Sequence, residues 1–138
     1  MENILNNLTI KPINIYISYQ DVDVAGVVYF ANYFNYGEKA RAVFLKETFG
    51  EINFLKDFAW AVKDIKARYL KPAKLGDTVV VNTVIDKINY ASVLFKHIFV
   101  INNIVIAEME VLVLSIDNNL KPAKISKEIL DIFKKFII

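Results

Sequence analysis

The sequence contains no cysteine, and His97 is its one histidine in 138 residues. A disulfide framework is therefore excluded, and so are the usual zinc sites, which rely on Cys and His ligands. Charge of one sign is also scarce, because 17 basic and 15 acidic residues leave a net charge of only +2. Nucleic-acid-binding proteins normally carry a larger or more clustered excess of Lys and Arg, so no nucleic-acid partner is expected.

Long hydrophobic runs are missing as well. The longest uncharged stretch, Val24–Gly37, falls short of the ~20 apolar residues that a membrane-spanning helix needs, so no transmembrane segment is predicted. The segment Met1–Thr9 carries Glu2 and three asparagines, without the basic and then apolar pattern of a secretory signal. Together with the lack of cysteine, this composition predicts a cytoplasmic protein.

Apolar residues, by contrast, are abundant in the sequence. Hydrophobic residues make up 55% of the chain and charged residues 23%. An intrinsically disordered chain is excluded, because such chains have too little apolar surface to offset the entropy of ordering. The length predicts a single folded domain over residues 1–138 with a core of its own.

The spacing of apolar residues changes along the first half. From Ile13 to Tyr19 the residues are mostly β-branched or aromatic and follow Pro12, which predicts a strand. From about Ala31 to Thr48 apolar residues recur every three or four positions, which predicts a helix closed by Gly50. The apolar share of this helix is wide, so we expect it to be largely buried.

The second half has the pattern of β structure followed by a short helix. Asn102 and Asn103 tolerate the positive φ angles of a two-residue turn and predict a hairpin. Ser126 is placed to cap a final helix with helically spaced apolar residues from Ile129 to Ile137. The order of elements predicts an α+β domain, with an antiparallel sheet wrapped round a long central helix and a C-terminal helix. The predicted strands of this half are Trp60–Leu70, Thr78–Asp86, Ser92–Ile101 and Ile104–Ile116.

The last predicted strand, Ile104–Ile116, is apolar on both faces near its ends. A sheet with one buried face should alternate apolar and polar residues, yet Leu112 and Leu114 share a face with Glu108 and Glu110. Two explanations stay open: this face is a subunit interface, or the C-terminal helix covers it.

Two carboxylates, Asp21 and Asp23, lie in the loop just ahead of the predicted long helix. A helix start offers unsatisfied backbone N–H groups and the positive end of the helix dipole, which suit a developing oxyanion. A neighbouring carboxylate can act as a nucleophile or as a general base. The alternative is that both residues only shape the loop, as aspartates commonly do. A magnesium site is disfavoured, because no phosphate-binding motif accompanies the pair.

The segment Asp21–Tyr33, with the sequence DVDVAGVVYFANY, and the following Gly37–Arg41 resemble the signature of a known family. It is the 4-hydroxybenzoyl-CoA thioesterase family of hotdog-fold acyl-CoA thioesterases, and within it the chain looks like the Tol–Pal-associated thioesterases. The likeness continues in Ala67–Asp77 and spans the chain from about Ile13 to Ile116. It implies a hotdog fold, which agrees with the predicted order of elements.

The resemblance also implies roles for single residues. Asp23 corresponds to the catalytic carboxylate, and Asp21 is then structural. The oxyanion and substrate-binding segment corresponds to Tyr29, Phe30 and Ala31, with the backbone N–H groups near Phe30 and Ala31 polarising the thioester carbonyl. Several members of the family have His where this chain has Phe30, a departure that removes a polar contact and leaves the backbone donor in place.

Other polar residues favour structural interpretations. Glu38 and Arg41 are spaced as an i, i+3 pair, which is more typical of an ion pair on a helix or at an interface than of catalytic groups. His97 is expected to be a packed or interface residue, and a hotdog dehydratase, which relies on a catalytic histidine, is disfavoured. One basic set could meet the phosphates of coenzyme A or simply be solvated, and it comprises Lys63, Lys66, Arg68, Lys71 and Lys74.

The function implied is hydrolysis of an acyl-CoA to a free acid and CoA, with no cofactor and no metal. Thioesters of acyl-carrier protein are also possible substrates. The family resemblance implies a homodimer, and the doubly apolar strand suggests a homotetramer. The alternative from another class is a non-catalytic hotdog subunit that binds acyl-CoA or acyl-carrier protein.

Overall fold

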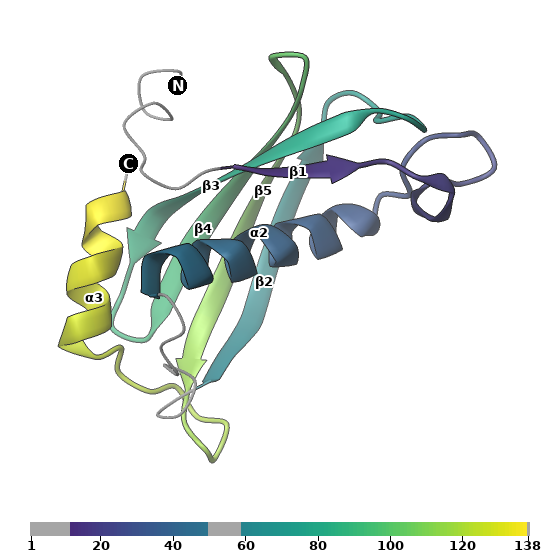
Figure 1. The fold of residues 1–138 in the computed structure, drawn as a ribbon. Coiled ribbons are helices and arrows are strands. Elements are labelled where there is room, and N and C mark those ends of the chain that lie inside the picture. Colours follow the sequence, from purple (N-terminus) through teal and green to yellow (C-terminus); the bar gives the residue numbers. More distant parts are fainter. Residues whose placement is uncertain (1–11, 50–58, 138) are drawn as a thin grey trace.

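The computed structural model describes residues 12–49 and 59–137 of the chain (Figure 1). The expected helix stop at Gly50 and the segment Met1–Thr9 lie outside these residues. None of the helices in the described part of the chain is long and apolar enough to cross a membrane. The elements are β1 (Ile13–Tyr16), the 3-10 helix η1 (Tyr19–Asp21), α2 (Asn32–Phe49), β2 (Ala59–Tyr69), β3 (Thr78–Ile88), β4 (Ser92–Ile101), β5 (Ile104–Ile116), α3 (Lys127–Phe133) and the 3-10 helix η3 (Lys134–Phe136).

The strands form one antiparallel sheet in the order β1-β3-β4-β5-β2, and α2 lies across one of its faces (Figure 1). The expected α+β architecture, a long helix against an antiparallel sheet, is confirmed. β4 and β5 have the predicted bounds, and the turn between them contains Asn102 and Asn103 with φ angles of 49° and 66°. β2 and β1 are the two edges of the sheet.

The first strand is shorter than predicted. The expected strand reached Tyr19, whereas β1 ends at Tyr16 and Tyr19 begins η1. Ser18 accounts for the difference, because its backbone N–H and its hydroxyl both donate to the Asp21 carboxylate, at 2.9 and 3.0 Å. This local capping interaction turns the chain away from the sheet before the β-branched run ends.

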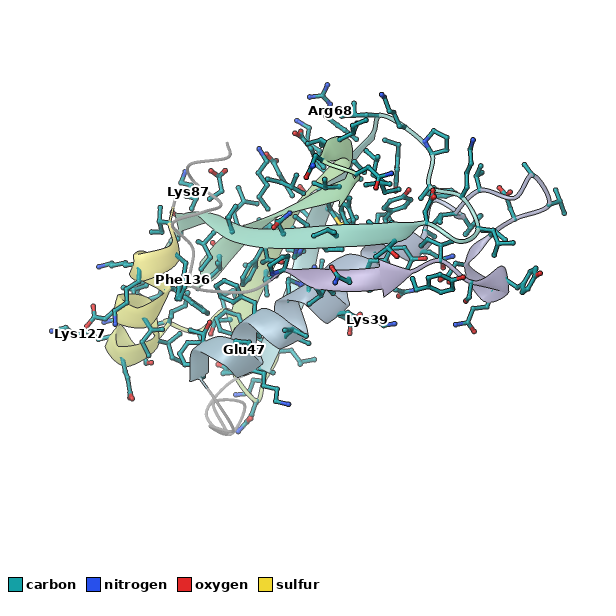
Figure 2. The ribbon with its side chains drawn as sticks, turned by 45° about the horizontal axis from the view of Figure 1, so that its top comes forward. Lys39, Glu47, Arg68, Lys87, Lys127 and Phe136 are labelled. Atoms are coloured by element: carbon teal, nitrogen blue, oxygen red, sulfur yellow. The ribbon has the colours of Figure 1, made fainter. Side chains whose placement is uncertain are left out.

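Helix α2 packs against the sheet through one face only. Tyr33, Tyr36, Ala40 and Phe44 on that face are at most 3% exposed. The opposite face is exposed, and Figure 2 shows Lys39 and Glu47 on the side of the helix away from the strands. The expectation of a largely buried helix is therefore wrong for the single chain, because one sheet covers only one side of a helix.

The C-terminal helix packs on the same side of the sheet as α2. Phe133 is fully buried, and its ring lies 6.4 Å from Phe44, 6.3 Å from Phe95 and 6.1 Å from Trp60 between centroids. Of the two explanations left open for the apolar outward face of β5, coverage by the C-terminal helix is therefore excluded. The predicted cap is confirmed, since Ser126 Oγ accepts from the Ile129 N–H, but the last helical turn is 3-10 and Ile137 follows it as a bridge residue.

Candidate active site

The loop between η1 and α2 folds back on itself as a small hairpin. Val22 and Val28 form an antiparallel bridge, and the Asp23 N–H donates to the Val27 carbonyl at 2.9 Å. Gly26, with a φ of 78°, takes the left-handed conformation at the tip, which an L side chain rarely adopts. Hydrogen bonds to the segment before β3 tie this loop down, including Val28 N–H to Ala73 O at 2.9 Å.

The Asp23 carboxylate lies on the exposed side of this hairpin. Its Oδ1 accepts a hydrogen bond of 2.8 Å from the Ala25 N–H, which closes an Asx turn. In the part of the chain that the structure describes, Oδ2 has no hydrogen-bond partner. The loop therefore fixes one oxygen of the carboxylate and leaves the other open to a substrate or to water.

Asp21 is held quite differently. Its carboxylate accepts from the Tyr36 hydroxyl at 2.7 Å and from the backbone and side chain of Ser18. Partial burial raises the pKa of Asp21, but the hydrogen bonds from Tyr36 and Ser18 outweigh this effect and leave the pKa below its usual value. The carboxylate accepts three hydrogen bonds with both of its oxygens, so its geometry is that of an anchor between η1 and α2.

The start of α2 presents two backbone N–H groups. The Tyr29 N–H is occupied by the Asp21 carbonyl at 3.1 Å, and the first turn engages the N–H groups of residues 32–34. Within residues 12–49 and 59–137, the N–H groups of Phe30 and Ala31 have no acceptor. Of the three residues predicted for the oxyanion and substrate segment, Phe30 and Ala31 thus retain free donors and Tyr29 does not.

A cavity of about 290 Å³ opens beside this helix start. Tyr69, at the end of β2, donates its hydroxyl to the Phe30 carbonyl at 3.0 Å. The same carbonyl accepts the Tyr33 N–H at 3.3 Å, so two donors hold the peptide group that links Phe30 to Ala31. The cavity is lined by Val28, Phe30, Tyr33, Tyr69, Leu70, Lys71 and Pro72.

The structure separates members of the basic set for which contact with the phosphates of coenzyme A was one of two alternatives. Lys71 lines the cavity at the helix start, and Lys74 pairs with Val27 of the Asp23 loop. Lys66 and Arg68 point to the opposite face of the sheet, where Figure 2 shows Arg68 remote from α2. Lys71 and Lys74, which follow β2, are the members of the set that the structure places near the candidate site.

A buried polar group lies farther along α2, and sequence reasoning missed it. Arg41 does not pair with Glu38 as expected; its guanidinium Nη1 lies 3.1 Å from Nε2 of His97. His97 is fully buried, as expected of a packed residue, and its Nδ1 lies 2.9 Å from Thr83 Oγ1. Burial, and then the nearby Arg41 charge, lower the pKa of His97 to about 3, so the imidazole is neutral.

The donor pattern of this group follows from the guanidinium. Arginine only donates hydrogen bonds, so Nε2 of His97 is the acceptor and Nδ1 carries the proton that it donates to Thr83. Gly37 leaves room for the ring, because a Cβ at this position would lie 3.2 Å from the His97 Cδ2. A glycine inside a helical pattern was the one available signal in the sequence that something packs closely there.

No metal cluster accompanies these groups: residues 12–49 and 59–137 contain no set of three or more His, Asp or Glu side chains placed to hold an ion.

Comparison with known proteins relates the chain to a family. Residues 17–133 match the sequence model of the thioesterase-like superfamily. The acyl-CoA thioesterase YbgC of Haemophilus influenzae is 31% identical over 122 residues, which cover 86% of this chain and 88% of that protein. The acyl-CoA thioester hydrolase YbgC of Escherichia coli is 32% identical over 128 residues, covering 90% and 94%.

A solved structure supports the fold independently. The 1,4-dihydroxy-2-naphthoyl-CoA thioesterase from Synechocystis superposes with a TM-score of 0.81 at 18% identity, covering 90% of this chain and 95% of that one. At this identity the likeness concerns the fold alone, a long helix against an antiparallel sheet. With the superfamily match over most of its length, the chain belongs to the thioesterase-like superfamily of hotdog-fold proteins.

Proposed function

We propose that this protein is an acyl-CoA thioesterase, which hydrolyses an acyl-CoA to a free acid and CoA. One observation carries the proposal: Asp23, with one carboxylate oxygen unbonded among the described residues, lies in a loop that returns to a helix start where the N–H groups of Phe30 and Ala31 have no acceptor among those residues. The hydrogen bond from Tyr29 N–H to Asp21 O joins the two ends of this loop at 3.1 Å. The relatives named acyl-CoA thioesterase support the same reaction.

In the proposed reaction the thioester carbonyl oxygen accepts hydrogen bonds from the N–H groups of Phe30 and Ala31. These donors and the positive end of the α2 dipole stabilise the negative charge that develops on this oxygen. Asp23 either attacks the carbonyl carbon itself or removes a proton from the water that attacks. In both routes the C–S bond breaks, CoA leaves as a thiol after gaining a proton, and water supplies the oxygen of the free acid.

Within the superfamily, we propose that the chain belongs with the 4-hydroxybenzoyl-CoA thioesterase family and its Tol–Pal-associated members. The support is the string from Asp21 to Tyr33, which resembles that family's signature and forms the hairpin and the helix start. The proposed location is the cytoplasm. Acyl-CoA is the proposed substrate, and an acyl-carrier-protein thioester remains part of the same proposal.

We also propose that the protein is a homodimer or a homotetramer. β2 is an edge strand of 11 residues, and a long unpaired edge is a surface that proteins normally cover. The outward face of the sheet carries half-buried Leu94, Leu112 and Leu114, and α3 lies on the other side. These two surfaces suit contacts with further copies of the chain.

The test is a hydrolysis screen against acyl-CoAs of increasing chain length and against aromatic acyl-CoAs, with release of the CoA thiol as the readout. Asp23→Asn keeps the Asx turn and removes the reactive carboxylate, so kcat should fall by ~10²–10⁴-fold. Asp117→Asn is the matched control, because Asp117 also accepts backbone N–H groups in an exposed loop. Asp21→Asn should cost much less activity than Asp23→Asn.

Two results would contradict the proposal. Hydrolysis by Asp23→Asn at the wild-type rate would remove Asp23 from the reaction. Tight binding of acyl-CoA or acyl-carrier protein without turnover by the wild type would favour the non-catalytic subunit.

A further inference from the structure

A second cavity lies between α2 and the beginning of β2, away from the helix start. Its volume is about 320 Å³, near the lower end of the ~300–1,000 Å³ typical of ligand pockets. Most of its wall is apolar, and Glu38 and Arg41 are its charged members. The proposed reaction uses none of these residues. The lining comprises Glu38, Arg41, Ala42, Leu45, Trp60, Val62, Phe95 and Val113.

Arg41 brings a charge into this cavity without a carboxylate bonded to it. Within the described residues, its side-chain hydrogen-bond partner is the neutral imidazole of His97. A guanidinium has five N–H donors, so this contact leaves most of them unused. Burial lowers the pKa of Arg41, and the charge of Glu38 raises it by a smaller amount. A partly buried guanidinium is stabilised by an anion, and a carboxylate, whose two acceptor oxygens lie in one plane, matches the geometry of its N–H groups.

The guanidinium is also held in place. His97 cannot move freely, because Thr83 binds its other nitrogen at 2.9 Å and the ring is fully buried. A side chain fixed in this way loses little further entropy when a ligand binds, which favours recognition. Glu38 is exposed at the edge of the cavity. Its negative charge attracts Arg41, and an incoming anion competes with this attraction.

We infer that this cavity binds a carboxylic acid with an apolar body. The carboxylate binds the free donors of Arg41, and the body packs against Leu45, Trp60 and Val62. Such a group has two sources: a free acid of the kind that thioester hydrolysis releases, or an acyl chain with a second carboxylate at its far end. The binding itself does not depend on hydrolysis, whereas the second source rests on the proposed function.

Trp60 is the chain's one tryptophan and lines the cavity, so its fluorescence reports occupancy directly. The first experiment titrates the full-length protein with octanoate and with octanamide, which has a similar size and no charge. We expect octanoate to bind at least about tenfold more tightly, because its carboxylate gains charge-assisted hydrogen bonds to the guanidinium that the neutral amide lacks. Equal affinities of the wild type for the two compounds would overturn the inference.

Variants at the charged residues test which side chain binds the carboxylate. Arg41→Gln should bring the octanoate affinity down to that of octanamide, and Arg41→Lys should retain part of the difference. Glu38→Gln should strengthen octanoate binding, because it removes the competing carboxylate. Arg68→Gln, at the chain's other arginine on the far face of the sheet, is the matched control and should leave binding unchanged. An unchanged octanoate affinity in a folded Arg41→Gln protein would also overturn the inference.

A second experiment separates the two sources by comparing hydrolysis of octanedioyl-CoA and octanoyl-CoA. A lower KM for octanedioyl-CoA that disappears in Arg41→Gln identifies the occupant as the end of the acyl chain. Equal KM values, with inhibition by octanoate that Arg41→Gln relieves, identify it as the free acid. If neither compound is hydrolysed, the proposed function fails, while the fluorescence titration still decides whether the carboxylate site exists.

Discussion

Asp21 and Asp23 are two residues apart and carry the same side chain, but their carboxylates have different hydrogen-bond partners. Asp21 accepts from Tyr36 and Ser18 and joins two elements, whereas Asp23 accepts one backbone N–H and keeps an oxygen free. Composition alone could not separate them, because the donor that occupies Asp21 lies 15 residues later. The family resemblance implies different roles for them, a structural one for Asp21 and a catalytic one for Asp23, and the catalytic role stays a prediction.

Tyr69 is expected to act on the helix start as a positioning residue. Its hydroxyl bonds the carbonyl of the same peptide group whose N–H belongs to Ala31, so it steadies a proposed oxyanion donor. Tyr69→Phe removes only this hydrogen bond, worth ~1 kcal/mol, and should lower kcat about fivefold with little change in KM. Steady-state kinetics with the preferred acyl-CoA provide the measurement.

The matched control for this change is Tyr90→Phe, at an exposed tyrosine in the β3–β4 turn. The Tyr69 contact is exposed, so the melting temperature should stay close to that of the wild type. A loss of kcat accompanied by an equal loss of stability would point to a purely structural role instead.

The buried histidine should make stability depend on pH. In the unfolded chain its pKa is near 6.5, and burial lowers it to about 3 in the folded protein. Between these values the unfolded state binds the extra proton, so the imidazole favours unfolding as the pH falls from 6.5 towards 3. One proton corresponds to a slope of up to ~1.4 kcal/mol per pH unit in the free energy of unfolding.

Urea unfolding of the wild type and His97→Gln at several pH values from 4.5 to 7.5 measures this slope. Carboxylates contribute similarly to both proteins, so the difference isolates the histidine. The wild-type advantage should shrink as the pH is lowered, and a constant difference across this range would contradict a neutral, buried His97.

At the scale of elements, the strand and helix ends that could be predicted from the sequence are those set by a turn or a cap nearby in the chain. The end of β4 and the start of β5 follow directly from the two asparagines between them, and the Ser126 cap marks the start of α3. The end of β1 was missed, because a side chain three residues farther on competes with the sheet for the Ser18 backbone. The contact of Arg41 with His97 joins residues 56 apart, and no periodicity reports which residues of two elements meet.

The turn of the β4–β5 hairpin gives a prediction about stability. Asn102 has a φ of 49°, and alanine in this left-handed region costs roughly 1–2 kcal/mol. Asn102→Ala should therefore lower the free energy of unfolding by about that amount, as measured by urea denaturation. Asn119→Ala is the control, because Asn119 is not in the left-handed region and uses its backbone N–H in the turn. Equal stabilities of the two variants would contradict the role of the turn.

At the scale of the whole molecule, the outward face of the sheet supplies a prediction about assembly. Leu112 lies on this face between Leu94 and the β2 edge and is half-buried. Leu112→Lys should reduce the proposed higher oligomer to a smaller species, because a lysine would be buried there without a partner. Light scattering at micromolar concentration measures the mass.

Leu120→Lys, in an exposed loop, makes the same change of charge and should leave the mass unaltered. A wild-type protein that is strictly monomeric in this experiment would contradict both the dimer and the tetramer.

The strand order also has a consequence for how the chain folds. β3, β4 and β5 are consecutive in sequence, and the tight turn at Asn102 and Asn103 joins the last two, so their pairing closes short loops. β1 and β2 come earlier in the chain and pair across much longer loops, which form more slowly. We therefore expect the three-stranded meander to form early, and the Asp23 hairpin, which follows β1, to reach its final place late.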